Sequence, residues 1–308
     1  MKEWQKILAG LVCVVGCFFL IDFLVGTASE KMYYDSKYGI FHRQIYCMEE
    51  SEDDVLVLGS SRAAHHYVPQ VFADSLGMNC YNCGSDGMCI YYHYAILSSY
   101  LRRGAVPKVV LYDVMALDAR ESNSATFCLG AALDRLAPHY GQVPEIDSLF
   151  ALNGWKEKVK LLSKTYRYNS KAVQTIKCNF IPWPEDRGYE ALNGTLNVDL
   201  LGPKPTSVPT GVIEPDKLVY VQKLIDACKA SGIRLYFLYS PYYRATNDYG
   251  IELVKEMAGE NGVPFWDFHQ NELFADEALF HDIDHLNDVG ARAYSQMIAG
   301  LIKNDLSQ

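Results

Sequence analysis

Residues 57–62 read VLGSSR, and both the fold and the function depend on how this stretch is interpreted. The run DVLVL at residues 54–58 is apolar after its first residue and is followed by Gly59, which is typical of a strand buried on both faces of a sheet. Two serines and an arginine follow at once. Either Ser60 or Ser61 is a nucleophile at the end of a strand, or the stretch is a polar turn in which a serine caps a helix.

Strand-like and helix-like segments alternate along most of the chain. Apolar runs predict strands at residues 54–58, 78–81, 108–114, 234–240 and 263–268. Periodic segments predict helices at residues 66–76, 90–103, 215–231, 250–261 and 287–303. This alternation predicts an α/β fold with a parallel central sheet, helices on both of its faces, and ligands at the carboxyl ends of the strands.

The alternation fails between residues 119 and 212. A helical stretch at about 147–177 is followed there by a segment rich in proline and glycine without a clear period. We interpret residues 119–212 as an insertion that caps the site. The expected organisation is an anchor or signal at residues 1–26, a polar stalk rich in tyrosine at 27–50, and an α/β domain at 51–308 that carries the insertion.

Composition excludes several classes of protein. The 308 residues include 49% hydrophobic and 13% aromatic residues, which indicates a globular chain. The net charge is -9, and the longest basic cluster is Arg102-Arg103, so we expect no nucleic-acid partner. The single glycine of VLGSSR makes neither a phosphate loop nor the GxSxG turn of α/β-hydrolases, and we expect no cofactor.

The N-terminus predicts a membrane segment. Residues 7–26 are apolar except for Asp22, and 20 residues at helical rise span about 30 Å, the thickness of a hydrocarbon core. Lys2 and Lys6 precede this run, which places the N-terminus in the cytoplasm and the rest of the chain outside it, in the periplasm or the exterior. The alternatives are a signal cleaved near residue 28, a lipoprotein signal at Cys17, and a buried core helix.

The nine cysteines fit no zinc pattern. Cys80 and Cys83 form a CxxC pair, but a second CxxC is missing, so buried small side chains are the preferred interpretation over a redox or disulfide role. An exported chain would permit disulfides.

Two further stretches lie where chemistry is expected. Residues 82–87, NCGSDG, follow the second predicted strand, and their glycines let a backbone amide point into a site. Residues 281–291 read HDIDHLNDVGA and precede the last helix. On a helical turn Asp282 would hold one nitrogen of His285, three residues away, and leave the other free to accept a proton from a serine. Asp284 is the competing carboxylate.

Two alternatives remain for the histidines. His281 and His285 have helical spacing, and His65-His66 follow the first strand, so a metal site is conceivable. Zinc chemistry needs three well-spaced protein ligands, and we therefore expect no metal. His285 could also be a structural histidine with satisfied hydrogen bonds.

Together, GxS after the first strand, NxGxxG after the second and DxxHLNxxGA before the last helix resemble the SGNH (GDSL-type) hydrolase superfamily. The resemblance covers about residues 53–118 and 215–303. It implies a flavodoxin-like three-layer sandwich with Ser61 as nucleophile, His285 as general base and Asp282 as the acid that orients it. It also implies an oxyanion hole formed by the amides of Ser61 and Gly84.

The sequence departs from the pattern of this superfamily in two places. Ser60 stands where the first block has aspartate. The third block places an asparagine after the third strand, but here residues 115–118 read MALD, which leaves the side-chain oxyanion donor unassigned. Asn123 is close in sequence but lies off the motif.

These patterns predict a membrane-anchored serine esterase or O-acyltransferase. Its expected substrate is an ester of a cell-envelope glycan or a related polymer. Arg62 is a candidate for binding an acidic substrate group, and partner proteins of envelope modification are expected. The alternative is a catalytically silent envelope-assembly or carbohydrate-binding protein with the same fold.

Overall fold

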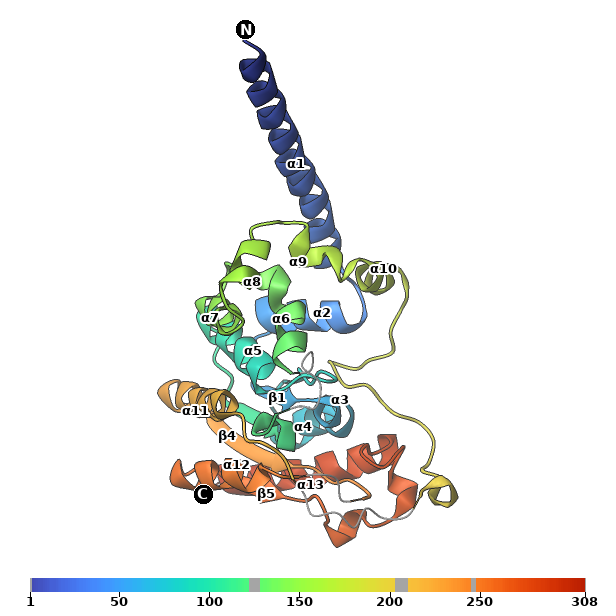
Figure 1. Ribbon diagram of the computed structural model, residues 1–308. Helices are drawn as coiled ribbons and strands as arrows, with labels where there is room; N and C mark the ends of the chain where they lie inside the picture. Colours follow the sequence, from blue (N-terminus) through green and yellow to red (C-terminus); the bar gives the residue numbers. More distant parts are fainter. Residues whose placement is uncertain (1, 122–127, 203–209, 245–247, 308) are drawn as a thin grey trace. The chain divides into compact units, whose positions relative to one another are not determined.

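The computed structural model describes residues 2–121, 128–202, 210–244 and 248–307 (Figure 1). The chain divides into two compact units. One, here called the helical unit, combines residues 1–42 with 133–183. The other, here called the sheet unit, combines residues 43–132 with 184–308 and contains every site residue predicted above.

A five-stranded, all-parallel sheet forms the centre of the sheet unit. Its strand order is β2-β1-β3-β4-β5. The strands are β1 (Val55–Gly59), β2 (Cys80–Asn82), β3 (Val109–Asp113), β4 (Arg234–Tyr239) and β5 (Phe265–Asp267). Because helices connect parallel strands, all five strands end at the same edge of the sheet, and the predicted α/β fold with a central parallel sheet is confirmed.

Helices cover both faces of this sheet. On one face, α3 (Ser61–His66) and α4 (Pro69–Leu76) pack against the C-terminal helix α13 (Asp288–Leu306) (Figure 1). The other face carries α5 (Ile90–Arg102) and α11 (Pro215–Ala230), which contact each other, and α12 (Ile251–Glu260) packs on α11 and β5.

Alternation along the strands explains why both faces need this cover. Val55 and Val57 of β1 belong to the core on the α13 side, with Ile298 and Ile302 of α13, and all four side chains are almost fully buried. Leu56 and the other residues of even position in β1 point the opposite way and are equally buried. A sheet buried on both faces is what the continuous apolar runs predicted.

One predicted helix is divided in the structure. Residues 66–76 were expected to form a single helix, but α3 ends at His66 and α4 begins at Pro69. Val68 lies between them with φ -92° and ψ 107°, an extended conformation. Proline disfavours helical conformation in the residue before it, and this explains the break.

The helical unit is built around α1 (Glu3–Tyr34). Tyr33 of α1 is fully buried against the rings of Phe41, His139 and Tyr168, and its hydroxyl lies 3.1 Å from His139 Nε2. The other helices of this unit are α7 (Pro144–Leu152), α8 (Trp155–Lys160), α9 (Tyr166–Asn169) and α10 (Ala172–Phe180). Two more, α2 (Gly39–Ile45) and α6 (Leu129–Leu136), run across the boundary between the units.

The boundaries of these units differ from the expected domains. Helix α1 continues to Tyr34, so the first part of the predicted stalk at 27–50 is helical, and Tyr33 is a core residue because it meets residues more than 100 positions away. The predicted insertion at 119–212 is also divided, since only residues 133–183 belong to the helical unit. That the insertion caps the site stays a prediction.

Helix α1 is long and apolar enough to cross a membrane. Its apolar residues from Ile7 to Val25 are mostly exposed, and Lys2 and Lys6 precede them. An anchor and a signal sequence both fit this helix.

Two disulfides lie in the sheet unit and join Cys47 to Cys83 and Cys89 to Cys128. The preferred interpretation of Cys80 and Cys83 as buried small side chains is therefore wrong for Cys83, which bonds to Cys47, and it holds for Cys80, a buried free thiol. Cysteine partners are set by the fold and cannot be deduced from spacing alone.

We predict five reactive thiols in the denatured, unreduced protein isolated from an export-competent host, because five of the nine cysteines are free. Reduction before labelling should raise the number to nine. It should also lower the melting temperature, since in the chain-entropy model each disulfide, closing 36 or 39 residues, contributes about 4 kcal/mol. Nine reactive thiols without reduction would contradict both pairings.

Candidate functional site

The end of β1 brings Ser61 to the edge of the sheet. Gly59 has φ 140°, and a Cβ built on it would lie 2.8 Å from both Ala63 Cβ and the carbonyl oxygen of Asp113. Only glycine therefore lets α3 turn back this tightly over β3. Ser61 is the first residue of α3, whereas Ser60 is buried before it and its carbonyl accepts a hydrogen bond from the amide of Ala64.

A closed loop before α13 carries the histidine. Phe280 and Leu286 form an isolated antiparallel bridge, and the amide of His281 donates to the carbonyl of His285 at 2.9 Å. Asn287 then caps α13 by accepting a hydrogen bond from the amide of Gly290 at 3.1 Å. The residues HLNDVGA thus close a loop and begin a helix, but Asp282 and His285 lie on a bend rather than on the helical turn expected from the sequence.

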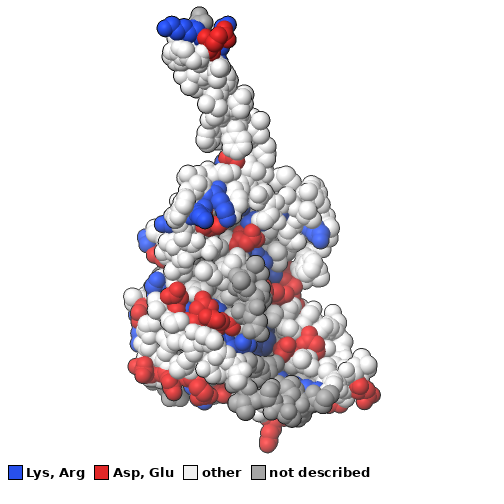
Figure 2. All heavy atoms as spheres, viewed as in Figure 1, with Lys and Arg blue, Asp and Glu red and all other residues white. Residues whose placement is uncertain are grey.

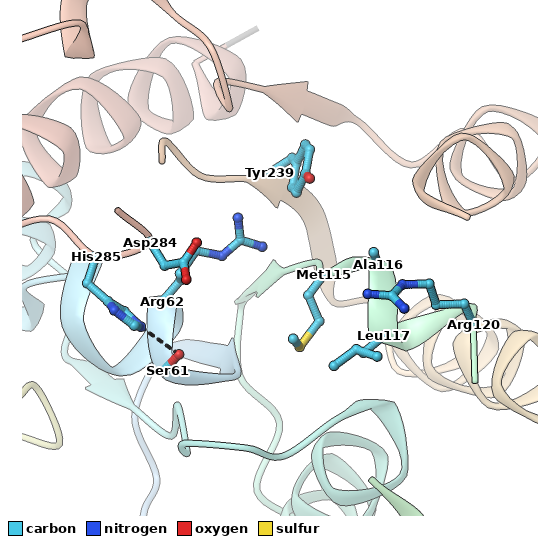
Figure 3. A pocket seen from close by; sticks show the side chains of 9 residues that line it. All are labelled: Ser61, Arg62, Met115, Ala116, Leu117, Arg120, Tyr239, Asp284 and His285. Atoms are coloured by element: carbon cyan, nitrogen blue, oxygen red, sulfur yellow. Dashed lines mark hydrogen bonds between the residues drawn. The ribbon is translucent and has the colours of Figure 1, made fainter. Parts of the chain in front are cut away.

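Ser61, His285 and Asp282 form one hydrogen-bonded chain. Ser61 Oγ lies 2.8 Å from His285 Nε2 (Figure 3). On the other side of the ring, His285 Nδ1 lies 2.9 and 3.0 Å from the two carboxylate oxygens of Asp282. The predicted acid is therefore the one in contact with the ring. Asp284 instead uses its amide to donate to Asp282 Oδ1 at 2.8 Å, and its side chain lines the adjoining pocket.

The surroundings of Asp282 keep this carboxylate ionised. Partial burial by itself would raise its pKa, but hydrogen bonds from the His285 ring and from the amides of Asp284 and His285 lower the pKa to about 2. An ionised Asp282 accepts the Nδ1 proton of His285 and leaves Nε2 as the acceptor for the hydroxyl proton of Ser61.

A second histidine holds the loop in place. His66 is fully buried, and its Nε2 accepts a hydrogen bond from the amide of Leu286 at 3.0 Å, while its Nδ1 lies 3.2 Å from Ser240 Oγ. Burial and the positive charges of neighbouring groups hold the pKa of His66 well below its usual value. A neutral His66 is required here because Nε2 must accept a hydrogen bond and so cannot carry a proton.

The ligand pattern considered for a metal is engaged in other contacts. Both ring nitrogens of His285 are occupied by Ser61 and Asp282. His281 Nδ1 lies 2.6 Å from the carbonyl of Asn193, and His65 Nδ1 lies 2.7 Å from the carbonyl of Glu190. These side chains hold the loops around the site.

Gly84 has a packing role that the sequence did not reveal. A Cβ at Gly84 would lie 2.4 Å from the amide nitrogen of Ala64, so this residue lets β2 pass close to α3. Its amide donates to Asn82 Oδ1 at 2.9 Å. The same Asn82 side chain donates to the carbonyls of Ala63 and Tyr67, which ties down α3. To serve as an oxyanion donor, the Gly84 amide would have to leave Asn82.

Residues 115–118 follow β3 at the position where the superfamily pattern has an asparagine. Ala116–Asp118 form a short 3-10 helix, and Asp118 accepts hydrogen bonds from the amides of Met115 and Ile90, both at 2.9 Å. Burial raises the pKa of Asp118 to about 6 although these hydrogen bonds oppose the rise. Asn123, which is off the motif, lies outside the described residues.

The guanidinium of Arg62 is bound within the protein. It donates to the carbonyl of Val114 at 2.8 Å and to that of Ser240 at 3.4 Å, and it lies 3.5 Å from the carboxylate of Asp113. Asp113 is buried and also accepts a hydrogen bond from the hydroxyl of Tyr67. The side chain of Arg62 is 13% exposed and contributes to the wall of the pocket, so it joins the strand ends more than it faces a ligand.

A pocket of about 220 Å³ opens beside the serine (Figure 3). Its walls combine apolar and charged groups: Ser61, Arg62, Met115, Ala116, Leu117, Arg120, Tyr239, Asp284 and His285. The His285 ring and the Ser61 hydroxyl point toward each other at one side of this space.

Several residues of the site were missed from the sequence. The loops and the helix that carry Ser61, His285 and Asp282 are held in place by buried side chains, namely His66, Asn82, Asp113 and Ser240. Asp113 and Ser240 carried a signal, since each stands at or just after the end of a strand, where the fold gathers ligands. His66 carried none that separates it from His65.

Comparison with known proteins gives matches among solved structures only, since no family model and no curated protein matches the chain. A protein from Desulfitobacterium hafniense described as lipolytic and of the G-D-S-L family is 9% identical, and the alignment covers 80% of this chain and 98% of that one, with a TM-score of 0.41. A protein from Bacteroides fragilis described as an acylhydrolase is 11% identical over 82% of this chain and 88% of its own, with a TM-score of 0.36.

An acetyl xylan esterase is also similar to this chain. It is 13% identical, and the alignment covers 80% of this chain and 99% of the esterase, with a TM-score of 0.35. At these identities the three proteins assign no substrate to this chain.

We predict that Arg62→Met lowers the free energy of unfolding of the sheet unit by about 3–5 kcal/mol, because it leaves the buried Asp113 carboxylate without its cation. The double variant Arg62→Met/Asp113→Asn should regain part of this loss, since the uncompensated charge is then gone. The measurement is thermal or urea unfolding of each variant. Unchanged stability of Arg62→Met together with weaker substrate binding would instead support the direct substrate role considered from the sequence.

Proposed function

We propose that this protein is a serine esterase or O-acyltransferase of the SGNH type, which acts through an acyl-Ser61 intermediate. One observation carries the proposal. The Ser61 hydroxyl lies 2.8 Å from one ring nitrogen of His285, and the other ring nitrogen lies 2.9 and 3.0 Å from the oxygens of the ionised Asp282 carboxylate. General-base activation of a nucleophile requires these contacts.

In the first step, Ser61 Oγ attacks the carbonyl carbon of a bound ester while His285 Nε2 accepts the hydroxyl proton. The positive imidazolium that forms is stabilised by Asp282. His285 then returns the proton to the departing alkoxide, and the acyl group remains on Ser61. A water molecule or an acceptor hydroxyl gives its proton to His285 and attacks the carbonyl carbon of the acyl group. The bond from that carbon to Ser61 Oγ then breaks, and His285 returns the proton to Ser61 Oγ. Water produces hydrolysis, and a sugar hydroxyl produces transfer.

The oxyanion needs donors during both steps. The amide of Ser61 belongs to the first turn of α3, where amides have no carbonyl partner within the helix, so it is the first candidate. We propose the Gly84 amide as a second donor, released from Asn82 when substrate binds. With no asparagine at residues 115–118, the oxyanion depends on these backbone groups.

The pocket has room for a small acyl group. Its volume of about 220 Å³ suffices for a short acyl group and part of a sugar ring. We therefore propose an acylated carbohydrate as the substrate, an acylated cell-envelope glycan being the case that the expected location suggests.

An extracytoplasmic location is part of the proposal. Helix α1 is preceded by Lys2 and Lys6, which favours a cytoplasmic N-terminus and a sheet unit on the other side of the membrane. The two disulfides support this location, because such bonds persist in oxidising compartments. Acyl donors and acceptors there would be supplied by partner proteins of envelope modification.

A catalytically silent binding protein is the second candidate. It is favoured by the engagement of the Gly84 amide with Asn82 and by the missing asparagine of the third block. In this case an acylated glycan would bind in the same pocket and remain unchanged.

We predict that a fluorophosphonate probe labels the protein and that Ser61→Ala abolishes the labelling. The matched control is Ser60→Ala, because Ser60 is the adjacent hydroxyl and contacts the fold through its backbone carbonyl. Hydrolysis of p-nitrophenyl acetate by Ser61→Ala should fall by at least about 10⁴-fold, as in other serine enzymes. A wild-type protein that is folded but not labelled would favour the binding protein.

We predict that Asp282→Asn lowers kcat for the same ester by about 10²- to 10⁴-fold, because the ring of His285 loses its orienting anion. The pKa of Asp282 is about 2, so the wild-type carboxylate is ionised throughout pH 5 to 8, and titration of Asp282 itself should not alter the wild-type rate over that range. Asp284→Asn is the matched comparison and should reduce kcat far less. A larger loss in Asp284→Asn than in Asp282→Asn would reverse the assignment.

A further inference from the structure

Two short helices of the helical unit turn apolar side chains outward. On α8 and the turn after it, Trp155, Val159 and Leu162 recur at helical spacing, and on α10 Val173, Ile176 and Phe180 do the same. Half or more of each of these six side chains is exposed, with Leu162 the highest at 78%. Helices on a water-soluble surface normally bury their apolar side chains, whereas these two helices expose them.

The same segment is strongly basic. Residues 155–183 contain seven Lys and Arg residues and one acidic residue, Glu157, which is a net charge of +6 in a chain of net charge -9. Some of these cations are paired within the helical unit, since Lys160 contacts Glu157, Lys164 contacts Glu30 and Lys171 contacts Asp134.

Three further lysines, Lys156, Lys158 and Lys177, are exposed on the helices that carry the apolar side chains. Figure 2 shows basic side chains gathered on this part of the helical unit. Apolar groups flanked by cations are the composition of a helix that lies in a lipid interface.

This surface is attached to α1 within the last turns of its apolar run. Asp22 of α1 accepts hydrogen bonds from Ser163 Oγ at 2.5 Å and from the amides of Lys164 at 2.9 Å and Thr165 at 3.2 Å. Leu162 is next to Ser163, so its side chain lies near the level of Asp22. The one carboxylate in the apolar run thus fixes the turn between α8 and α9 (Figure 1).

An apolar groove lies between α1 and this turn. It has a volume of about 410 Å³, and Phe18, Ile21 and Val25 of α1 face Lys160 and Tyr166 across it. If α1 crosses a bilayer, this groove opens where acyl chains meet headgroups.

We propose that residues 155–181 form a lipid-facing surface, in which the apolar side chains of α8 and α10 enter the interface of the bilayer that α1 crosses. Lys156, Lys158 and Lys177 contact the headgroups of anionic phospholipids. The proposal rests on α1 spanning the membrane and is independent of the chemistry at Ser61. It commits to lipid as the occupant because residues 160–169 of this segment line the apolar groove on α1 and the surface is opposite in charge to anionic headgroups.

The test is quenching of tryptophan emission in the full chain, reconstituted in nanodiscs of phosphatidylcholine alone or mixed with equal phosphatidylglycerol. Brominated lipids quench only tryptophans within the bilayer. The difference between the wild type and Trp155→Phe isolates the emission of Trp155. The difference between the wild type and Trp4→Phe reports the insertion of α1 separately, so a failure of the anchor is recognised as such.

We expect Trp155 to lose most of its emission to brominated lipids and to be more strongly quenched in the anionic nanodiscs. Lys156→Gln/Lys158→Gln/Lys177→Gln should remove the dependence on phosphatidylglycerol. The matched control, Lys229→Gln/Lys255→Gln/Lys303→Gln, changes three lysines of the sheet unit and should leave it intact. Equal melting temperatures of the wild type and both triple variants would show that the variants are folded.

Two results would overturn the proposal. In the first, brominated lipids quench Trp4, which shows that α1 is inserted, but they do not quench Trp155, whereas aqueous iodide does. The other is shielding of Trp155 from iodide in native membranes but not in nanodiscs, which would assign the surface to a protein partner.

Discussion

The contact between Ser61 Oγ and His285 Nε2 joins residues 224 positions apart, and the proposed chemistry depends on it. Parallel topology makes the contact possible, because β1 and the segment before α13 reach the same edge of one sheet. Close packing then sets the distance. Gly59 and Gly84 bring α3 against β3 and β2 at separations that a Cβ would not permit. The position of Ser61 thus depends on two residues without side chains, Gly59 and Gly84.

Buried polar groups complete this support and determine its electrostatics. Arg62, in the wall of the pocket, pairs with the buried Asp113, and neutral His66 accepts a hydrogen bond from the amide of Leu286, next to His285. Such groups are costly to bury unless they are fully paired, so they hold one geometry and discriminate against others. The reacting residues remain partly exposed above this layer, where a substrate can reach them.

The sequence was sufficient for the sheet and for the proximity of Ser61, His285 and Asp282, whose catalytic roles stay a proposal. Buried parallel strands leave continuous apolar runs, and the serine and histidine follow or precede such elements at recognisable positions. Spacing alone also preferred Asp282 over Asp284, although the bend that realises it is not a helix. These features are local, and local patterns are what a single sequence records.

The features that were not predicted depend on partners far away in the chain. Arg62 is held by Asp113 and Ser240, and Cys83 finds Cys47 rather than the nearby Cys80. Tyr33 is a core residue of the helical unit because residues 133–183 return to α1. Asp22 interrupts the apolar run of the sequence. Its presence there is explained by the hydrogen bonds that its carboxylate accepts from amides of the α8–α9 turn.

The most direct test of the central claim is a crystal structure of the protein after reaction with a small alkyl phosphonate. The account predicts phosphorus bonded to Ser61 Oγ, His285 Nε2 within hydrogen-bond distance of the adduct, and the phosphoryl oxygen facing the amide of Ser61. The same structure tests the role of Gly84 as an oxyanion donor. If Gly84 has this role, its amide turns from Asn82 to the phosphoryl oxygen. Phosphorus on another residue, or a His285 ring turned away from the adduct, would contradict the account.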